Sequence, residues 1–251
     1  PYRHRGEVTE RLLEARGVPG PWPEAIHNRE QVGDNPDERM QAMVRAYYDA
    51  EVETLDQEIG ALMSLLAERT SRETWLILTS DHGEELFEHG GFEHGHSLHE
   101  EVLRVPLLLR PPGKPIGEPV ESPVSLLDIA PTLLDLAGLP GEESTFGRSL
   151  LASDPPSPRL LAASGVLYGP PEEALLLGSE KRLREGDRVR SYDLATDPDE
   201  ADPRPSSPGE FQAHWRLVEH LDATHQAVLD LSSEEALLLS LYPTCNPTFP
   251  A

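Results

Sequence analysis

The sequence predicts an α/β fold in which a mixed, mostly parallel sheet is flanked by helices and followed by a small C-terminal antiparallel α+β subdomain. Two apolar runs, residues 75–79 and 105–110, have the length and the polar borders of buried strands. One helical pattern precedes the first run and another follows the second, an alternation that favours a sheet covered by helices. Beyond residue 158, short strand-like pieces separated by Gly and Pro indicate the antiparallel subdomain.

The longest predicted helix begins after residues 35–36, an Asn-Pro start signal, and its apolar residues recur in steps of four and three. Acidic residues occupy the other faces, so we expect this helix to pack on a sheet. Its apolar stripe consists of Tyr48, Val52, Leu55, Ile59, Leu62 and Leu66. A shorter helix is expected over residues 8–16. Another is expected over residues 125–138, where Asp128 is placed to cap it, Gly138 to end it, and its leucines to lie in the core.

These elements divide the chain into four segments. Residues 1–36, rich in Pro, Gly and charge, form an irregular connection. Residues 37–153 form the α/β part, residues 158–242 the small subdomain and residues 243–251 a tail. Four strands are predicted in the subdomain, over residues 160–167, 174–177, 181–184 and 188–194.

Length and charge limit the classes of partner. A chain of 251 residues can bury one substantial core with a small appended subdomain. Lys and Arg number 21 against 45 Asp and Glu, and the net charge of −24 argues against nucleic acid or an anionic membrane as a partner. An anionic substrate is compatible, because a bound cation dominates the field of its own site. The single cysteine, Cys245, excludes an internal disulfide, and no run of 18 apolar residues occurs.

Candidate site residues gather in the loop between the two apolar runs. Asp81 and His82 directly follow the first predicted strand, and ligands gather at the carboxyl ends of strands in open α/β sheets. Twelve residues later the loop brings His94, followed by His96 and His99. Carboxylate and imidazole are ligands that suit a borderline divalent cation, and the glycines of the loop would let it fold over an ion. Taken alone, the Asp-His pair also fits a surface loop with solvated histidines.

The residues TSDHGE, the Gly-rich and His-rich loop after them, an HGH triplet and the strand-like residues 104–109 together resemble the sulfatase branch of the alkaline phosphatase superfamily. The resemblance implies an alkaline phosphatase-like fold. It also implies that Asp81 and His82 are metal ligands. By the same resemblance, His94 contacts the metal or the transferred group, and His96 is the second choice for this catalytic role. The remaining histidines of the loop, His89 and His99, are expected either to support these residues without touching the metal or to be solvated.

Further segments resemble the same family in the same order along residues 40–242. They are the helical residues 125–140, a G-x-S-L turn at 147–150, a YDL-x-x-DP-x-E pattern at 191–200 and a closing segment at 231–242. The family's Cys or Ser, x, Pro, x, Arg nucleophile pattern has no match here. The resemblance therefore implies that the nucleophile, a formylglycine made from Cys or Ser, lies upstream of this chain. Pro1 and Tyr2 resemble the end of the family's His-x-Pro-Tyr turn.

The function expected from the resemblance is a metal-dependent sulfatase, a hydrolase that releases sulfate from a small-molecule or glycan sulfate ester. Calcium is the usual ion of the family, and two imidazoles would also suit manganese or zinc. The alternatives are a phosphoryl-transfer relative, such as a phosphodiesterase or phosphoethanolamine transferase, and a noncatalytic sulfatase-like domain. We expect no turnover from residues 1–251 alone. A periplasmic or secreted location is what the resemblance suggests, although no signal-peptide pattern occurs in these residues.

Overall fold

A computed structural model describes residues 2–26, 29–33, 35–69, 73–114, 117, 119–120, 122–140, 147–151 and 159–216. By its internal contacts the chain forms two compact units. The first unit comprises residues 1–94 and 104–117, and the second comprises residues 95–103 and 118–251. The four segments expected from the sequence stay a prediction. The tail at 243–251 and the closing segment at 231–242 lie outside the described residues.

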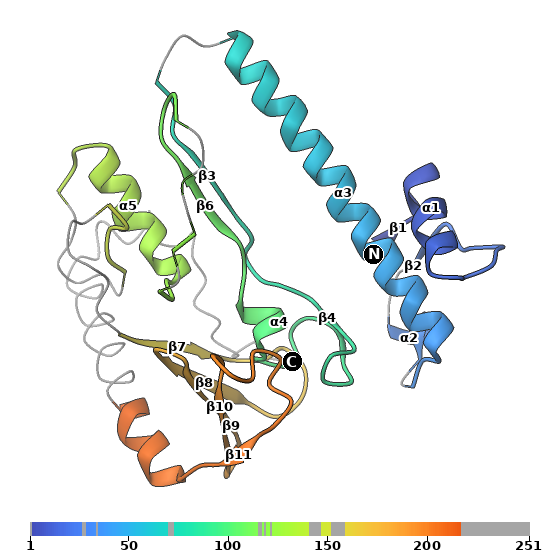
Figure 1. The fold of residues 1–251 in the computed structure, drawn as a ribbon. Helices are drawn as coiled ribbons and strands as arrows, with labels where there is room; N and C mark the ends of the chain where they lie inside the picture. The colour runs from blue at the N-terminus through green and yellow to red at the C-terminus, as the bar shows by residue number, and fades with distance from the viewer. Residues whose placement is uncertain are drawn as a thin grey trace, which may run out of the picture. The chain divides into compact units, whose positions relative to one another are not determined.

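The described residues of the first unit form three helices and three pairs of short strands, which are labelled in Figure 1 where there is room. Its N-terminal part consists of β1 (Tyr2–Arg3), α1 (Glu7–Ala15), β2 (Ala25–Ile26), α2 (Arg29–Val32) and α3 (Glu38–Arg69). The helix expected over residues 8–16 is confirmed by α1. Strand β1 pairs antiparallel with β2, and α1 packs on α3. The core between them is formed by Leu13, Val18, Ile26, Val32, Met43, Val44, Ala46, Tyr47 and Phe92.

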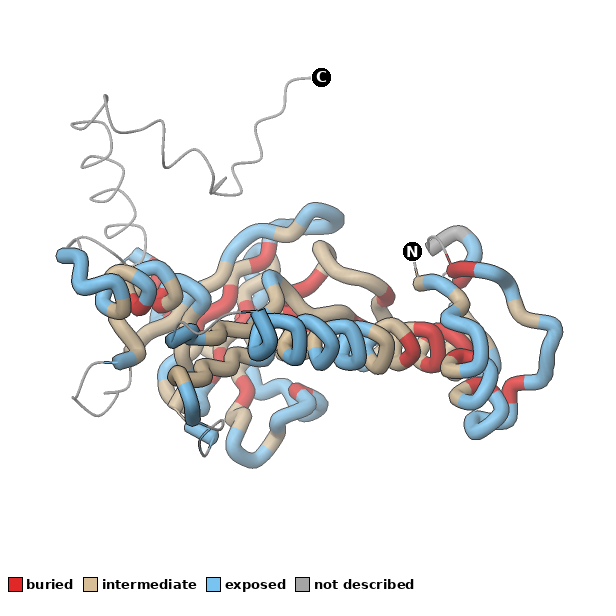
Figure 2. The backbone as a smooth tube through the Cα atoms, turned by 90° about the horizontal axis from the view of Figure 1, so that it is seen from above, coloured by how far each residue is buried: buried red, intermediate tan, exposed pale blue. Residues whose placement is uncertain are grey.

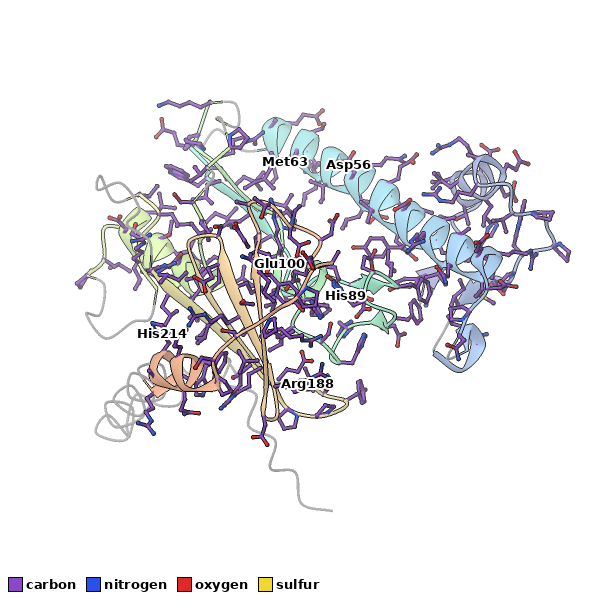
Figure 3. The ribbon with its side chains drawn as sticks, turned by 60° about the horizontal axis from the view of Figure 1, so that its bottom comes forward. Asp56, Met63, His89, Glu100, Arg188 and His214 are labelled. Carbon is purple, nitrogen blue, oxygen red and sulfur yellow. The ribbon has the colours of Figure 1, made fainter. Side chains whose placement is uncertain are left out.

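Helix α3 begins where the sequence predicts, because the Asp37 carboxylate accepts a hydrogen bond from the backbone N–H of Met40 at 2.8 Å. Its buried residues lie in its first half, between Met43 and Ala50, whereas most of the expected apolar stripe is exposed, as the tube in Figure 2 shows. The expectation that this stripe packs on a sheet is therefore wrong for the described residues. Figure 3 marks the second half of the helix by Asp56 and Met63. No helix among the described residues is apolar and long enough to span a membrane.

Strands β3 (Leu76–Thr79) and β6 (Leu107–Arg110) confirm the two apolar runs as strands. They pair antiparallel, from Leu76 opposite Arg110 to Thr79 opposite Leu107. Every strand pair among the described residues is antiparallel, so the mostly parallel sheet predicted from the order of elements is not found there. The physical reason lies in the connection: a parallel pair needs a crossover, usually a long helix, and residues 80–106 contain only short elements.

The second unit is built on a five-stranded antiparallel sheet of order β11-β10-β9-β8-β7. The strands are β7 (Leu160–Ser164), β8 (Glu172–Leu177), β9 (Glu180–Glu185), β10 (Arg188–Asp193) and β11 (Arg204–Pro205). This confirms the small antiparallel sheet predicted from the sequence. One apolar cluster joins Leu98, which precedes α4 (Glu100–Leu103), to Ala174, Leu183 and Tyr192. A second cluster joins Leu175 and Val189 to the helical residues 208–216 through Phe211 and Trp215.

Helix α5 (Ile129–Leu136) continues a 3₁₀ turn, η1 (Leu126–Asp128). The expected cap, Asp128, makes no side-chain cap bond to α5; Ser125 caps η1 instead, with Asp128 as its partner in a capping box. The expected end of this helix at Gly138 is confirmed. Gly138 has a φ of +66°, and the N–H groups of Gly138 and Leu139 reach back to Asp135 and Leu134 in a Schellman motif. The leucines are not core, however, since Leu126, Leu127 and Leu133 are exposed.

Asp128 is buried because it joins three segments of the second unit. Its carboxylate accepts hydrogen bonds from the backbone N–H groups of Ser125 and Arg148, both at 2.9 Å, and pairs with the Arg159 guanidinium. Gly147 precedes this contact, and a Cβ there would lie 1.9 Å from the backbone oxygen of Leu127. The G-x-S-L turn therefore requires its glycine for close approach to η1.

A buried charged cluster ties residues 95–103 to the sheet. Lys181 Nζ on β9 lies 2.9 Å from Glu100 Oε1 and 3.0 Å from Glu200 Oε1. The other oxygen of Glu200 accepts the backbone N–H of Glu100 at 2.6 Å and lies 3.2 Å from His99 Nδ1. The side chains of Lys181 and Glu200 are 1% and 0% exposed. The YDL-x-x-DP-x-E pattern thus supplies Glu200 as the centre of this cluster, while Asp197 accepts two backbone N–H groups of the following turn.

Replacing Lys181 by Met should destabilise the second unit strongly. The substitution keeps the length of the side chain but leaves Glu200 buried without its ammonium partner, which costs about 3 kcal/mol of unfolding free energy. Urea unfolding followed by circular dichroism measures the change. The matched control is Arg188→Met on the neighbouring strand, where the side chain is exposed, and we expect a change within about 0.5 kcal/mol. Equal effects of the two variants would contradict the importance of the cluster.

The same cluster predicts acid sensitivity. Burial alone would raise the pKa of Glu200, but His99 and the Lys181 ammonium outweigh burial and lower it from 4.5 to about 2. A carboxyl whose folded pKa is depressed stabilises the fold above its unfolded pKa, and this stability is lost as the pH falls from 4.5 towards 2. The loss should amount to roughly 3 kcal/mol. Unfolding free energies measured across this pH range for wild type and Glu200→Gln should differ in slope, and parallel curves would contradict the assignment.

Candidate metal centre and active site

A short hairpin brings the candidate residues together. Strand β4 (Glu85–Leu86) pairs antiparallel with β5 (Phe92–Glu93), with Glu85 opposite Glu93 and Leu86 opposite Phe92. Glu84 precedes Glu85 and His94 follows Glu93, so both residues directly flank this pair. Their side chains are in contact. The hairpin therefore places residues ten apart in the sequence side by side.

The turn of this hairpin is held by a buried carboxylate. Glu85 is 1% exposed, and its Oε1 accepts hydrogen bonds from the backbone N–H groups of His89 and Gly91. The turn also contains two left-handed residues, Phe87 with a φ of 75° and Gly90 with a φ of 86°. A bulky residue in this region is strained, so the contacts of Glu85 compensate for a backbone that the sequence alone would not favour.

Asp81 and His82 follow β3 as predicted. Asp81 Oδ2 lies 3.8 Å from His82 Nε2, and the Asp81 side chain is 87% exposed. The slight burial of Asp81 acts to raise its pKa, but His82 and hydrogen bonds from backbone N–H groups and Ser80 hold the pKa below its ordinary value. The carboxylate is therefore anionic at neutral pH.

The tautomer of His82 follows from its contact with the chain. Nδ1 lies 2.9 Å from the backbone oxygen of Gly83, an acceptor, so Nδ1 carries the proton. Nε2 is then the ring nitrogen with a lone pair, and it is the atom that faces Asp81. A metal-ligating histidine is commonly oriented in this way by a backbone carbonyl.

His94 lies against His82, and Glu84 contacts its other side. The two imidazole rings are 3.9 Å apart between centroids, at an interplanar angle of 34°. His94 Nδ1 is 2.5 Å from Glu84 Oε1, and Glu84 Oε2 accepts a hydrogen bond from the Tyr2 hydroxyl at 2.6 Å. The His94 side chain is 41% exposed and the Glu84 side chain 17%. This histidine is thus both anchored and accessible.

Tyr2 is fixed by its aromatic neighbours. Its ring makes edge-to-face contacts with Tyr48 at 5.8 Å and with Phe92 at 5.9 Å between centroids. Burial, together with the hydrogen bond to Glu84, raises the pKa of Tyr2 well above its ordinary range. The hydroxyl donates its hydrogen bond to Glu84.

Tyr2, Asp81, His82 and Glu84 border an open hollow of about 390 Å³. One side is formed by Ser80, Asp81, His82 and Glu84, and another by the middle of α3, including Tyr48 and Glu51. Arg5 also borders the hollow, where its guanidinium pairs with Glu51. The hollow gives a solute access to Asp81 and His82.

The donor atoms fit a divalent cation. Asp81 and His82 offer a carboxylate oxygen and a lone-pair nitrogen 3.8 Å apart, a separation that one ion can bridge. A second combination exists, because ligand atoms of His82, Glu84 and His94 lie within 4.8 Å of one another. In that combination Glu84 already accepts from Tyr2 and contacts His94 with its two oxygens, so its capacity for an ion is smaller.

The structure brings together three of the four site residues expected from the sequence, namely Asp81, His82 and His94. The fourth, His96, belongs to the second unit, so its role stays a prediction. His89 is exposed, as expected, whereas His99 is buried in the charged cluster. Glu84, although part of the DHGE motif, and Tyr2 were not predicted as site residues from the sequence.

The known proteins that resemble this chain agree on one family. Residues 18–139 match the family model described as Sulfatase. Arylsulfatase K of Danio rerio is 41% identical over 109 residues, which are 43% of this chain and 21% of that protein. The matched part therefore spans about a fifth of this curated relative.

Two solved structures have a similar fold. A 2-O GAG sulfatase has a TM-score of 0.63 and 22% identity, covering 80% of this chain and 47% of that one. A phosphonate monoester hydrolase from Silicibacter pomeroyi has a TM-score of 0.59 and 20% identity, covering 88% of this chain and 49% of that one. The chain thus spans about half the length of both, and at these identities the likeness concerns the fold.

Proposed function

We propose, on the premise that this chain belongs to the sulfatase family, that it carries the metal-site part of a sulfuric ester hydrolase. Such an enzyme converts a sulfate ester and water into an alcohol and sulfate. The observation that carries the proposal is that Asp81 and His82 border one accessible hollow and that His94 lies against His82.

Asp81 and His82 are the proposed metal ligands. The anionic oxygen of Asp81 and the lone pair on Nε2 of His82 point to the same side, and the backbone oxygen of Gly83 holds the His82 tautomer. A divalent cation bound there, calcium by family resemblance, would supply a Lewis acid and a template for the transferred group. The net charge of −24 does not oppose an anionic ester, because the cation would dominate locally.

His94 is the proposed catalytic residue. Its ring lies tilted against that of His82, so it lies beside any group that the ion holds. In the cationic form, with both ring nitrogens protonated, Nε2–H can stabilise charge on a nonbridging oxygen or pass its proton to the leaving alcohol oxygen. His96 remains the second candidate. By resemblance we expect a formylglycine nucleophile, for which residues 1–251 contain no matching pattern.

For the substrate we propose a sulfated glycan or small sulfate ester, since a similar fold belongs to a 2-O GAG sulfatase. The rival class is a phosphoryl or phosphonyl ester, since a similar fold also belongs to a phosphonate monoester hydrolase. The YDL-x-x-DP-x-E pattern at 191–200, which resembles sulfatases, favours the sulfate ester.

The metal assignment predicts a loss of bound metal. In the complete protein, Asp81→Asn combined with His82→Gln should reduce the metal content, measured by inductively coupled plasma mass spectrometry, to a small fraction of the wild-type value, because the anionic oxygen and the imidazole nitrogen are both replaced by weaker neutral amide groups. His89→Gln is the matched control, an exposed histidine of the same loop, and should retain the metal. Full metal content in the double variant would exclude this pair as the ligands.

The activity assignment predicts sulfate release. The complete protein should hydrolyse an aryl sulfate or a sulfated glucosamine faster than the corresponding aryl phosphate or phosphonate. His94→Gln should lower kcat by roughly 10²- to 10⁴-fold, the usual contribution of a positioned acid or base. Ion chromatography of released sulfate measures both. Preference for the phosphonate would support the rival class, and undiminished turnover in His94→Gln would remove this residue from the catalytic set.

A further inference from the structure

We propose that Tyr2, Glu84 and His94 form a hydrogen-bonded chain in which Glu84 and Tyr2 are positioning residues for His94. This inference deepens the proposed function and rests on it for its kinetic part. Glu84 would accept the Nδ1 proton of His94 with one oxygen and the Tyr2 hydroxyl proton with the other. The chain would fix which ring nitrogen of His94 can meet a bound group.

The hydrogen-bond chemistry of Glu84 determines where its two partners carry their protons. An ionised carboxylate has acceptors only, so each partner that touches it must donate. The contacts of 2.5 Å to His94 Nδ1 and 2.6 Å to the Tyr2 hydroxyl therefore place a proton on each of these two atoms. With Nδ1 protonated, a neutral His94 carries its lone pair on Nε2. Nε2 is then the atom that can meet a bound group.

The partners of His94 are held rigidly by the fold. Glu84 and His94 directly flank the outermost pair of the β4–β5 hairpin, Glu85 opposite Glu93, so this pairing keeps them close together. The Tyr2 ring is held between Tyr48 and Phe92, and its hydroxyl donates to Glu84. A donor fixed on one oxygen limits rotation of the carboxylate about its last bond. The other oxygen is thereby held towards His94.

The rival interpretation makes Glu84 a metal ligand together with His82 and His94, whose ligand atoms lie within 4.8 Å of one another. Both oxygens of Glu84 are already engaged by Tyr2 and His94. Asp81, by contrast, is 87% exposed and faces Nε2 of His82. The distribution of contacts thus favours Asp81 for the ion and Glu84 for orienting His94.

The test combines a structural measurement and kinetics on the complete protein. Long-range proton–nitrogen NMR spectra of protein labelled with ¹⁵N-histidine report which ring nitrogen is protonated, and His94 is identified by the signal that His94→Gln removes. Glu84→Met keeps the size of the side chain and removes the acceptor. Tyr2→Phe removes only the hydroxyl. Glu88→Gln, an exposed carboxylate of the same hairpin, is the matched control.

We expect wild-type His94 to be protonated at Nδ1 and Glu84→Met to return it to the tautomer mixture of unconstrained histidine. We also expect kcat to fall about 10- to 100-fold in Glu84→Met and about 3- to 10-fold in Tyr2→Phe. KM and metal content should stay near the wild-type values. Glu88→Gln should change none of these quantities.

Two results would overturn the proposal. A fall in metal content in Glu84→Met comparable to that in the Asp81 and His82 double variant would make Glu84 a ligand. A His94 that is protonated at Nε2 in the wild type, or that keeps its tautomer in Glu84→Met, would remove the hydrogen-bonded chain. The NMR measurement needs no substrate, so it decides the chain even if the complete protein hydrolyses no sulfate ester. Failure of the proposed function and failure of this inference are thus distinguishable.

Discussion

The register of the β4–β5 pair is the constraint on which the candidate site depends. Glu85 opposite Glu93 is the outermost pair, and Glu84 and His94 directly flank it. A slip by one residue would turn the alternate side chains to the other face and separate these two groups. Strands of two residues have few ladder bonds to resist such a slip. The buried carboxylate of Glu85, which accepts two backbone N–H groups of the turn, supplies the missing specificity.

The backbone next to the site is held in an unfavourable conformation by the surrounding core. Glu93, which directly precedes His94, has a φ of 71°, a value that few residues other than glycine adopt. Its neighbour Phe92 is 4% exposed and packs against Phe87 and Tyr2. Burial of these rings compensates for the local cost and thereby determines the direction in which His94 leaves the strand. The Tyr2 ring packs against this core, and its hydroxyl donates a hydrogen bond to Glu84.

The features that were predicted correctly are those that depend on local sequence patterns. The two apolar strands, the long helix after Asp37, the antiparallel subdomain and the Asp-His pair after β3 are all readable from period, capping and position. The pairing direction of β3 and β6 was not readable, because element order does not reveal the length of a crossover. Glu84 was missed because its role depends on a cross-strand partner ten residues away, and two-residue strands have no period to indicate that partner.

The histidines of the loop illustrate why residue type alone does not assign chemistry. His99 is 5% exposed and lies beside the Glu200 carboxylate, so it contributes to a structural ion cluster of the second unit. His82 and His94 are 39% and 41% exposed, and each has Nδ1 engaged by an oxygen of the chain. Engagement of Nδ1 directs ligand chemistry to Nε2. Burial and the partner of each ring nitrogen therefore separate the histidines that can meet an ion or substrate from the one that holds the fold together.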